Sequence, residues 1–366
     1  MYKYINKKIK EYSDKEYSFI TGNGTSAIYL ALVASGIPKG SKIAVPNISC
    51  PDPIYALIWA GYKPLFIDVN LEDYNINIDS LEKALKEDSE IKAIIAIHLF
   101  GNACEIVSIK KLSEKYNCFL LEDCAQAFGN AIDEGKLGSF GDVSIFSFGN
   151  GKIIEVGHGG SAQSNDKELM NKIKLKYEKL DNYDEKKINK LSKIHRSIYY
   201  KLYYLGLKFP LLNILNLVYV YFFKNYYLYQ LDKKYIEQIK SKIDDFTIDK
   251  IDRINIIEQY IKNLKDTVNI PTINNKENIL SRFTIVINNS EEISEKIRYE
   301  KIPSNTMYPM LIDRFGLFFN KNEYINSYKL KGKLLNLWTN GVDKQQMDKS
   351  IEIIKNRYVD IIREEN

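Results

Sequence analysis

Two short apolar runs, each followed by polar or charged residues, make residues 119–152 the most constraining stretch of this sequence. The first run, residues 119–121, is followed by Glu122 and Asp123; the second, residues 143–148, is followed by Gly-Asn-Gly and Lys152. Short apolar runs bounded by glycine and polar residues are typical of buried strands. In open α/β sheets, ligands bind beyond the carboxyl ends of the strands. We therefore expect Asp123 and Lys152 to face one crevice.

An aspartate and a lysine in one crevice suit the chemistry of pyridoxal phosphate (PLP). The lysine would form a Schiff base with this cofactor, and the aspartate would keep the pyridine nitrogen protonated so that the ring accepts electrons. The same two residues could instead form a salt bridge at a sheet edge, because charged residues are common at strand ends. The pair alone leaves both interpretations open, and other parts of the chain have to decide.

The composition is that of a soluble globular protein. Of 366 residues, 45% are hydrophobic and 27% are charged, which suits one large domain and a smaller one. The net charge of +5 is spread along the chain without a basic block, so we expect no nucleic-acid partner. The charged N-terminus lacks the apolar core of a signal peptide. We expect free thiols in a cytoplasmic protein, because no metal-ligand spacing joins the four cysteines, Cys50, Cys104, Cys118 and Cys124.

A helix start near residue 24 offers a second binding feature. Gly22, Gly24, Thr25 and Ser26 lead into a helical pattern over residues 28–36. Backbone N–H groups at a helix start, together with the positive end of the helix dipole, favour an anion. The spacing matches neither a Walker A motif nor the full GxGxxG pattern, and Thr and Ser cap many helices. In company with Lys152, we interpret it as a phosphate site.

Strand-like and helix-like segments alternate between residues 42 and 118. The strand-like segments cover residues 42–49, 63–69 and 91–101, and the segments that separate and follow them have helical patterns. This alternation predicts a mostly parallel sheet with helices on both faces.

Seven segments of this chain resemble, in order and spacing, the DegT/DnrJ/EryC1/StrS family. They are GTSAIYLAL, VPNIS, LFIDV, HLFGNACEI, LEDCAQAFG, GSFGDVSIFSFGNGK and GHGGSAQSND, within residues 18–166. Members of this family are fold type I, PLP-dependent aminotransferases that act mostly on nucleotide-linked keto-sugars. The resemblance implies a three-layer α/β fold with a mostly parallel sheet. It also implies a large PLP-binding domain over residues 1–245 and a smaller C-terminal α/β domain over residues 246–366.

The resemblance assigns cofactor roles to four of these residues. It implies that Lys152 is the Schiff-base lysine and that Asp123 is the partner of the pyridine nitrogen. Gln126 matches a position beside the phenolic oxygen of the ring, although a helix-capping amide is the alternative. Ser147 matches a serine that contacts the phosphate together with the backbone of the helix start. Some relatives carry histidine in place of the lysine and act as dehydratases, so lysine favours transamination.

Three positions depart from the family pattern. Cys50 stands where relatives place an aromatic ring over the cofactor; a sulfur atom over the ring is mildly favourable, and a plain core cysteine is the alternative. His158 stands where relatives often carry an acid, so we consider both a substrate contact and a local turn role. Asn225 matches an asparagine that reaches the neighbouring subunit's cofactor phosphate, with Tyr227 in place of the arginine that normally follows. His98 is expected to end its strand as a core residue, with ligand contact as the alternative.

The resemblance weakens between residues 167 and 245. Residues 166–193 are charged and are predicted to be helical, and an aromatic-rich helical segment occupies about residues 190–230. Lys208, Pro210 and two asparagines interrupt its apolar residues, which argues against a transmembrane helix. The alternatives are packing on the body of the protein or on a partner subunit, a membrane-surface patch, and a lid on the active site. We favour packing.

Two residues of the C-terminal part are candidates for substrate contact. Tyr308 matches the tyrosine of the family's substrate-facing loop. Arg282 stands where relatives often carry an uncharged residue or histidine, and its planar guanidinium suits a carboxylate or a phosphate. A surface charge at a strand edge is the alternative for Arg282.

These observations predict a homodimeric, PLP-dependent aminotransferase. The resemblance implies an amino-acid donor, glutamate by family, and a nucleotide-linked keto-sugar acceptor for a surface polysaccharide such as capsule or lipopolysaccharide. One alternative is a transaminase for a small phosphorylated ketone. The other is a regulatory or assembly protein that binds PLP without turnover, and the intact set of Asp123, Gln126, Ser147 and Lys152 argues against it.

Overall fold

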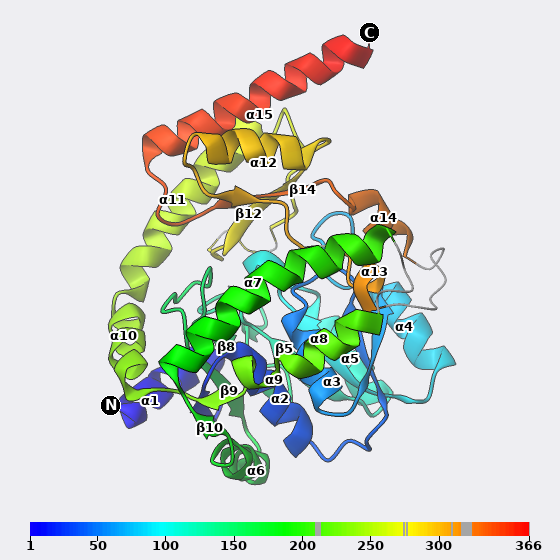
Figure 1. The fold of residues 1–366 in the computed structure, drawn as a ribbon, viewed down its shortest axis with the longest axis vertical. Helices are drawn as coiled ribbons and strands as arrows, with labels where there is room; N and C mark the ends of the chain where they lie inside the picture. The colour runs from blue at the N-terminus through cyan, green and yellow to red at the C-terminus, as the bar shows by residue number, and fades with distance from the viewer. Residues whose placement is uncertain (209–213, 274, 276, 309, 316–323, 366) are drawn as a thin grey trace.

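A seven-stranded sheet forms the centre of the molecule (Figure 1). The computed structural model describes residues 1–208, 214–273, 275, 277–308, 310–315 and 324–365. The strand order is β1-β9-β8-β5-β4-β2-β3, and β9 runs antiparallel to both of its neighbours. The expected mostly parallel sheet is therefore confirmed. Its strands are β1 (Tyr17–Thr21), β2 (Lys42–Pro46), β3 (Lys63–Ile67), β4 (Ile91–Ile97), β5 (Phe119–Asp123), β8 (Val143–Ser147) and β9 (Gly160–Ser164).

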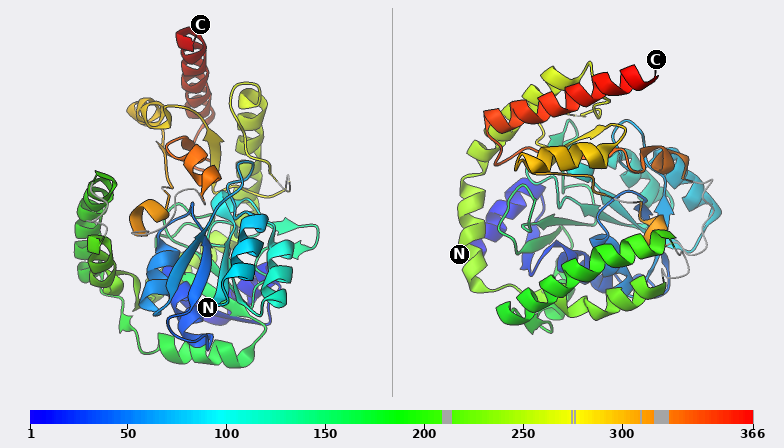
Figure 2. Two further views of the ribbon diagram at one scale, coloured as in Figure 1. Left: turned by 90° about the vertical axis from the view of Figure 1, so that its right-hand side faces the viewer. Right: turned by 45° about the horizontal axis from the view of Figure 1, so that its top comes forward.

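Helices cover both faces of this sheet (Figure 2). Along β2, Val45 packs on one face and Ala44 on the other, as expected because successive side chains of a strand point to opposite faces. One face packs against α2 (Gly24–Ala34), α3 (Asp52–Trp59) and α6 (Lys167–Tyr177). The other packs against α1 (Tyr2–Ser13), α4 (Ile78–Glu87), α5 (Ile106–Lys115) and α10 (Lys233–Asp244). These are the three layers expected from the sequence.

A smaller antiparallel sheet, in the order β12-β14-β13, lies in the upper part of Figure 1. Its elements are β12 (Arg282–Val286), β13 (Ser304–Asn305), β14 (Leu334–Trp338), α11 (Phe246–Leu264), α12 (Ser290–Tyr299) and α15 (Lys344–Glu365). They share a hydrophobic cluster drawn from residues 257–354. Residues 310–312, however, pack into the core of the large sheet. A domain boundary at residue 245 stays a prediction.

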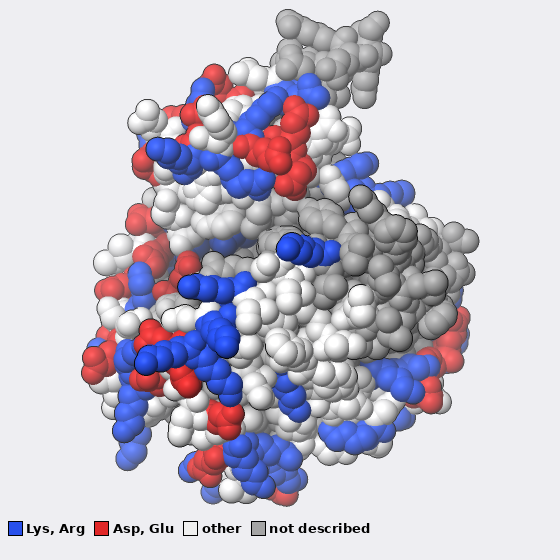
Figure 3. Space-filling view, in the orientation of Figure 1, with Lys and Arg blue, Asp and Glu red and all other residues white. Residues whose placement is uncertain are grey.

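Short elements connect these layers. They are η1 (Leu99–Gly101), β6 (Ala131–Ile132), β7 (Gly135–Lys136), α13 (Ile312–Phe315) and α14 (Ile325–Leu330). The four cysteines are free thiols, as expected. On the face shown in Figure 3, basic and acidic side chains are interspersed over the upper part and the lower left edge.

The charged segment at residues 166–193, expected to be helical, is not helical throughout. β10 (Asp181–Asn182) interrupts it and pairs with β11 (Tyr229–Gln230). Between these strands lie α7 (Glu185–Lys208), α8 (Ile214–Phe222) and α9 (Lys224–Tyr227). A two-residue strand has too weak a local signal to be recognised before its partner, some fifty positions away, is known.

The aromatic-rich segment packs partly on the body of the protein. Tyr219, Val220 and Phe223 are buried with α3, and the indole N–H of Trp59 donates to the Val220 carbonyl oxygen at 3.0 Å. Val218, Tyr221 and Phe222 of α8 are exposed. Several of its aromatic and leucine side chains, including those of residues 203–204 and 211–212, lie outside the described residues. Within the described part of the chain, no helix is long and apolar enough to cross a membrane.

Candidate functional site

A small cavity opens at the carboxyl ends of β5 and β8. These neighbouring strands run parallel, with Asp123 opposite Ile145, so their ends reach one edge of the sheet. Lys152 follows β8 in a turn and lines the cavity together with Asp123. The remaining lining residues are Gly24, Thr25, Ile28, Cys50, Asp52, Pro53, Ile97, Ala125, Gln126, Ile145 and Ser147.

A wider surface depression, lined among others by Lys15, Phe119, Asp142 and Lys172, lies at the amino ends of the strands. Ligands of open α/β sheets bind at the carboxyl ends. The smaller cavity also holds the chemically distinctive residues, so it is the candidate site.

Asp123 is buried at the end of β5, with 4% of its surface exposed. Its Oδ1 accepts the N–H of Ala125 at 2.9 Å. Burial raises the pKa of this carboxyl, although the positive charge of Lys152 acts in the opposite direction. A buried carboxyl held in this way is well placed to bind a protonated nitrogen in the cavity.

The start of α2 forms another part of the cavity wall. Asn23 caps the helix, because its Oδ1 accepts the N–H of Ser26 at 2.8 Å and the Ser26 hydroxyl accepts the N–H of Asn23 at 3.0 Å. A Cβ at Gly24 would lie 2.8 Å from the Cβ of Ser147. The backbone of α2 therefore approaches Ser147 more closely than a side chain at residue 24 permits. This cradle fits a phosphate, since helix starts favour anions.

Asn23 was not singled out in the sequence. The signal that would have found it is an asparagine three residues before a serine at a helix start, the spacing of a reciprocal cap.

Gln126 and Cys50 also border the cavity. The Oε1 of Gln126 accepts the N–H of Phe100 and the hydroxyl of Ser281, both at 3.2 Å. These bonds join the large sheet to the chain at β12. Burial raises the pKa of the Cys50 thiol, which favours a neutral sulfur at the cavity wall. The cofactor contacts of both residues stay predictions.

Arg282 and Tyr308 lie near the cavity without lining it. The Arg282 guanidinium stacks 3.8 Å above the Trp338 ring and occupies the space that a Cβ at Gly151 would need. It is thus beside the turn that carries Lys152. Burial lowers its pKa, which Tyr308 and Glu155 oppose. The ring of Tyr308 stacks on Phe100 with centroids 5.7 Å apart.

The structure places His158 and Asn225 away from the cavity lining. His158 lies in an aromatic cluster, where its Nδ1 is 2.8 Å from the Tyr229 hydroxyl and its ring packs on Tyr183 and Tyr235. Burial lowers its pKa. These contacts agree with the structural role considered for His158. Asn225 is exposed on α9. A substrate contact by His158 and a partner contact by Asn225 stay predictions.

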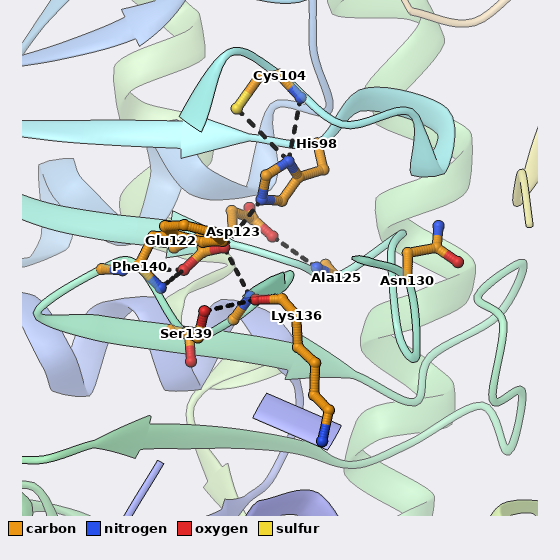
Figure 4. A network of polar contacts seen from close by, with 12 residues as sticks. His98, Cys104, Glu122, Asp123, Ala125, Asn130, Lys136, Ser139 and Phe140 are labelled. Carbon is orange, nitrogen blue, oxygen red and sulfur yellow. Dashed lines mark hydrogen bonds and ion pairs between the residues drawn. The ribbon is translucent and has the colours of Figure 1, made fainter. Parts of the chain in front are cut away.

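His98 and Glu122 form a buried polar network on the other side of β5 (Figure 4). Their Nε2 and Oε1 atoms are 3.2 Å apart, and Nδ1 of His98 accepts the N–H of Cys104 at 3.2 Å. Glu122 also accepts the N–H groups of Gly138, Phe140 and Gly141. His98 is completely buried, as a core residue should be. Its Nε2–H is the donor to Glu122, because Nδ1 is occupied as an acceptor.

The same network contains a cluster of His98, Glu122 and Cys124 whose candidate ligand atoms lie within 4.8 Å of one another. We assign it no metal, because the histidine and the carboxylate already have protein partners. Burial raises the pKa of the Cys124 thiol and so disfavours the thiolate that a metal would need.

Comparison with known proteins finds relatives that point to one family. Residues 2–218 match the family model of the DegT/DnrJ/EryC1/StrS aminotransferase family. The chain is 37% identical over 169 residues to GDP-perosamine synthase of Escherichia coli O157:H7, covering 45% of this chain and 46% of that protein. It is 39% identical over 166 residues to UDP-4-amino-4,6-dideoxy-N-acetyl-beta-L-altrosamine transaminase of Campylobacter jejuni, covering 45% and 44%. The chain spans about half the length of the curated relatives it matches.

Solved structures share the fold over nearly the whole chain. A DegT DnrJ EryC1 StrS aminotransferase from Brucella abortus superposes with a TM-score of 0.77 at 24% identity, covering 97% of this chain and 90% of that one. PseC of Helicobacter pylori, an aminotransferase involved in the biosynthesis of pseudoaminic acid, gives 0.76 at 18% identity, covering 98% and 91%. The fold, the ordered segments and the family match agree, and the chain belongs to the DegT/DnrJ/EryC1/StrS aminotransferase family.

Proposed function

We propose that this protein is a PLP-dependent aminotransferase that transfers an amino group from an amino acid to a nucleotide-linked keto-sugar. The observation that carries the proposal is the meeting of Lys152, Asp123 and the start of α2 around one cavity. Membership of this aminotransferase family supports pyridoxal phosphate as the cofactor. When bound, PLP supplies a ring that withdraws electrons from the substrate carbon carrying the amino group.

The residues of the cavity fit this cofactor at both ends. The N–H groups at the start of α2 and the Ser147 hydroxyl would bind the phosphate. The Asp123 carboxylate would hydrogen-bond the ring nitrogen and hold a proton there. Lys152 would bind the cofactor covalently, and its Nζ, once released, would take up and return the proton at Cα of the substrate. Gln126 and Cys50 would flank the ring.

The relatives support a sugar substrate. Their names include a GDP-perosamine synthase, a UDP-linked sugar transaminase and a lipopolysaccharide biosynthesis protein of Salmonella typhimurium. By analogy, the acceptor of this protein is a keto-sugar destined for a surface polysaccharide, with glutamate as the donor. Arg282 lies close to the Lys152 turn and donates to the Ser281 carbonyl oxygen, and its guanidinium would bind an acidic group of donor or acceptor. Tyr308 and His158 are the further substrate-contact candidates.

The proposal includes a homodimer that works in the cytoplasm. Asn225 is exposed beside exposed apolar side chains of α8, where a second subunit could cover them. The other subunit's Asn225 would then reach the cofactor phosphate, as the family resemblance implies.

Covalent trapping tests the proposal directly. The purified protein should be yellow, and borohydride should fix the cofactor to Lys152, as read by peptide mass spectrometry. Lys152→Ala should lose both the adduct and turnover, whereas Lys172→Ala, on the exposed face of α6, should keep both. An adduct on another lysine would contradict the assignment.

The substrate class needs a separate experiment. Protein loaded with pyridoxamine phosphate is mixed with nucleotide-linked keto-sugars or with small phosphorylated ketones, and its conversion to PLP is followed by absorbance. Conversion by a keto-sugar supports the proposal. Conversion by phosphorylated ketones alone contradicts it.

A further inference from the structure

A second carboxylate lies in the cavity beside Lys152. Asp52 is the first residue of α3 and stands between Pro51 and Pro53. It lines the same cavity as Lys152 and Asp123. The cofactor contacts proposed above leave Asp52 without a role, although a charged residue is costly to keep at a largely buried site.

Asp52 is the inner end of a chain of three polar side chains. The Tyr227 hydroxyl donates to Oδ1 of Asp52 at 3.2 Å and lies 3.1 Å from Nε2 of His195. A tyrosine has one proton to give. If that proton points to Asp52, then His195 must supply the proton of the second bond from its Nε2. These hydrogen bonds link the cavity to α7. Along the sequence, His195 is 143 positions and Tyr227 is 175 positions from Asp52.

Several groups surround the carboxyl of Asp52. Burial raises its pKa and outweighs the charge of Lys152 and the hydrogen bonds from Tyr227, Cys50 and Thr25, which act in the opposite direction. The second carboxyl of the cavity, Asp123, also acts on this region, since its own pKa is raised in part by Asp52.

Aromatic groups surround the outer half of the chain. Burial raises the pKa of Tyr227, with further contributions from Asp52, Tyr55 and Tyr219, so the tyrosine stays a neutral donor. The His195 ring packs within 5.2 Å of Phe223 and Tyr226, between centroids. This packing fixes the ring that supplies the second bond.

The charges of the cavity explain what Asp52 can do. Among the described residues that line the cavity, Lys152 is the only basic one, and Asp52 and Asp123 are the two acidic ones. Asp123 is matched to the ring nitrogen in the proposed function. Asp52 is then the anion available to the Lys152 nitrogen, and an anion close to an amine favours and orients its protonated form.

We propose that Asp52 is a positioning residue for Lys152, and that the hydrogen-bonded chain through Tyr227 to His195 holds Asp52 in place as an anion. This inference rests on the proposed function, because it assumes that Lys152 is the reacting amine. Asp52 holds the amine by charge and hydrogen bonding while Lys152 transfers the proton.

The first experiment tests the chain without cofactor or activity. The protein contains three histidines, so the signal of each can be followed by NMR during a pH titration of apoprotein with labelled histidine. The variant His195→Gln identifies the signal of His195. Asp52→Asn and Tyr227→Phe should each lower the titration midpoint of His195 by roughly 0.5 unit or more, because each removes a group that favours the imidazolium. The matched controls, Asp133→Asn in an exposed turn and Tyr226→Phe, should leave it unchanged. If the titration midpoint of His195 is unchanged in Asp52→Asn and Tyr227→Phe, the proposed hydrogen-bonded link from Asp52 through Tyr227 to His195 is overturned.

The second experiment tests the effect on Lys152 by the visible absorption of the bound cofactor as a function of pH. In Asp52→Asn the spectral midpoint should fall by about 1 unit, because the anion that favours the protonated Lys152 nitrogen is gone. Asp52→Glu should restore part of the shift, and Asp133→Asn should match the wild type. A wild-type profile in Asp52→Asn overturns the inference alone. Failure of the wild type to form any Lys152 adduct contradicts the proposed function and, with it, the role given to Asp52.

Discussion

The two sides of strand β5 carry consecutive carboxyl groups in opposite environments. On one side, Glu122 is completely buried and accepts three backbone N–H groups as well as the imidazole N–H of His98. On the other side, Asp123 faces a cavity and accepts one backbone N–H. The alternation of side chains along a strand is sufficient to separate the two.

The pKa values of the two carboxyl groups are shifted in opposite directions. Burial raises the pKa of Glu122, but hydrogen bonds from His98, Gly138 and Gly141 outweigh it, and the net pKa is lowered. For Asp123, burial prevails and the pKa is raised. A carboxylate with a full set of donors stabilises the fold. One with few donors can bind a ligand but costs stability.

Glu122→Gln should produce the largest effect on stability. The amide keeps one acceptor but turns an N–H₂ group toward backbone donors, which are left without partners. We expect a loss of about 3–5 kcal/mol in the free energy of unfolding, measured by urea denaturation. Asp123→Asn is the matched control on the other side of the strand and should show no such loss. Equal losses in both variants would contradict the division between the two sides.

Asp123→Asn should instead damage catalysis. The variant should still bind PLP, but a neutral ring nitrogen makes the cofactor a poorer electron sink. A lost charge-assisted hydrogen bond of about 3 kcal/mol corresponds to roughly 100-fold in rate. Steady-state kinetics of the folded variant provide the measurement. Turnover close to that of the wild type would show that another group serves the ring nitrogen.

The placement of Asp123 and Lys152 at one cavity could be predicted from sequence because its signals are local. The apolar runs that end at Asp123 and shortly before Lys152 indicate strands, and their order implies neighbouring ends. His98 was likewise expected in the core. The number of backbone donors around Glu122 could not be predicted, because those donors come from an irregular loop at residues 138–141.

The hydrogen-bonded chain of Asp52, Tyr227 and His195 shows more clearly what could not be predicted from the sequence. Its members lie on α3, α9 and α7 and meet only through tertiary packing. The one local signal is an aspartate placed between two prolines at a helix start, where Asp is common for reasons of capping and dipole alone. The short pair β10 and β11 was missed for the same reason.

Gly24→Ala should weaken cofactor binding at the cavity side. The new Cβ would lie 2.8 Å from the Cβ of Ser147, so α2 or β8 has to shift, at a cost of about 1–3 kcal/mol. PLP affinity, measured by titrating apoprotein, should fall about 10-fold or more. Gly149→Ala is the matched control, because its Cβ would meet the Ser147 hydroxyl at an ordinary 3.5 Å. Equal affinity in both variants would argue against close approach as the basis of the phosphate site.

The smallest expected effect is a gain in stability of the apoprotein in Asp123→Asn. Because the folded-state pKa of Asp123 is raised, the folded state binds this proton more tightly than the unfolded state, so wild-type stability falls as the pH rises from the unfolded value of about 3.9 through the folded value. Asparagine has no such proton. The variant should therefore be more stable than the wild type at neutral pH, and the difference should shrink toward pH 4. Glu122→Gln should show the reverse pH dependence, because the folded-state pKa of Glu122 is lowered. The wild type should be more stable than this variant by the full amount above about pH 4.3, and the difference in stability should shrink as the pH falls through the folded value. Urea denaturation of both apoproteins across this range compares the two sides of β5 directly, and parallel pH profiles for the two variants would show that the strand does not separate them.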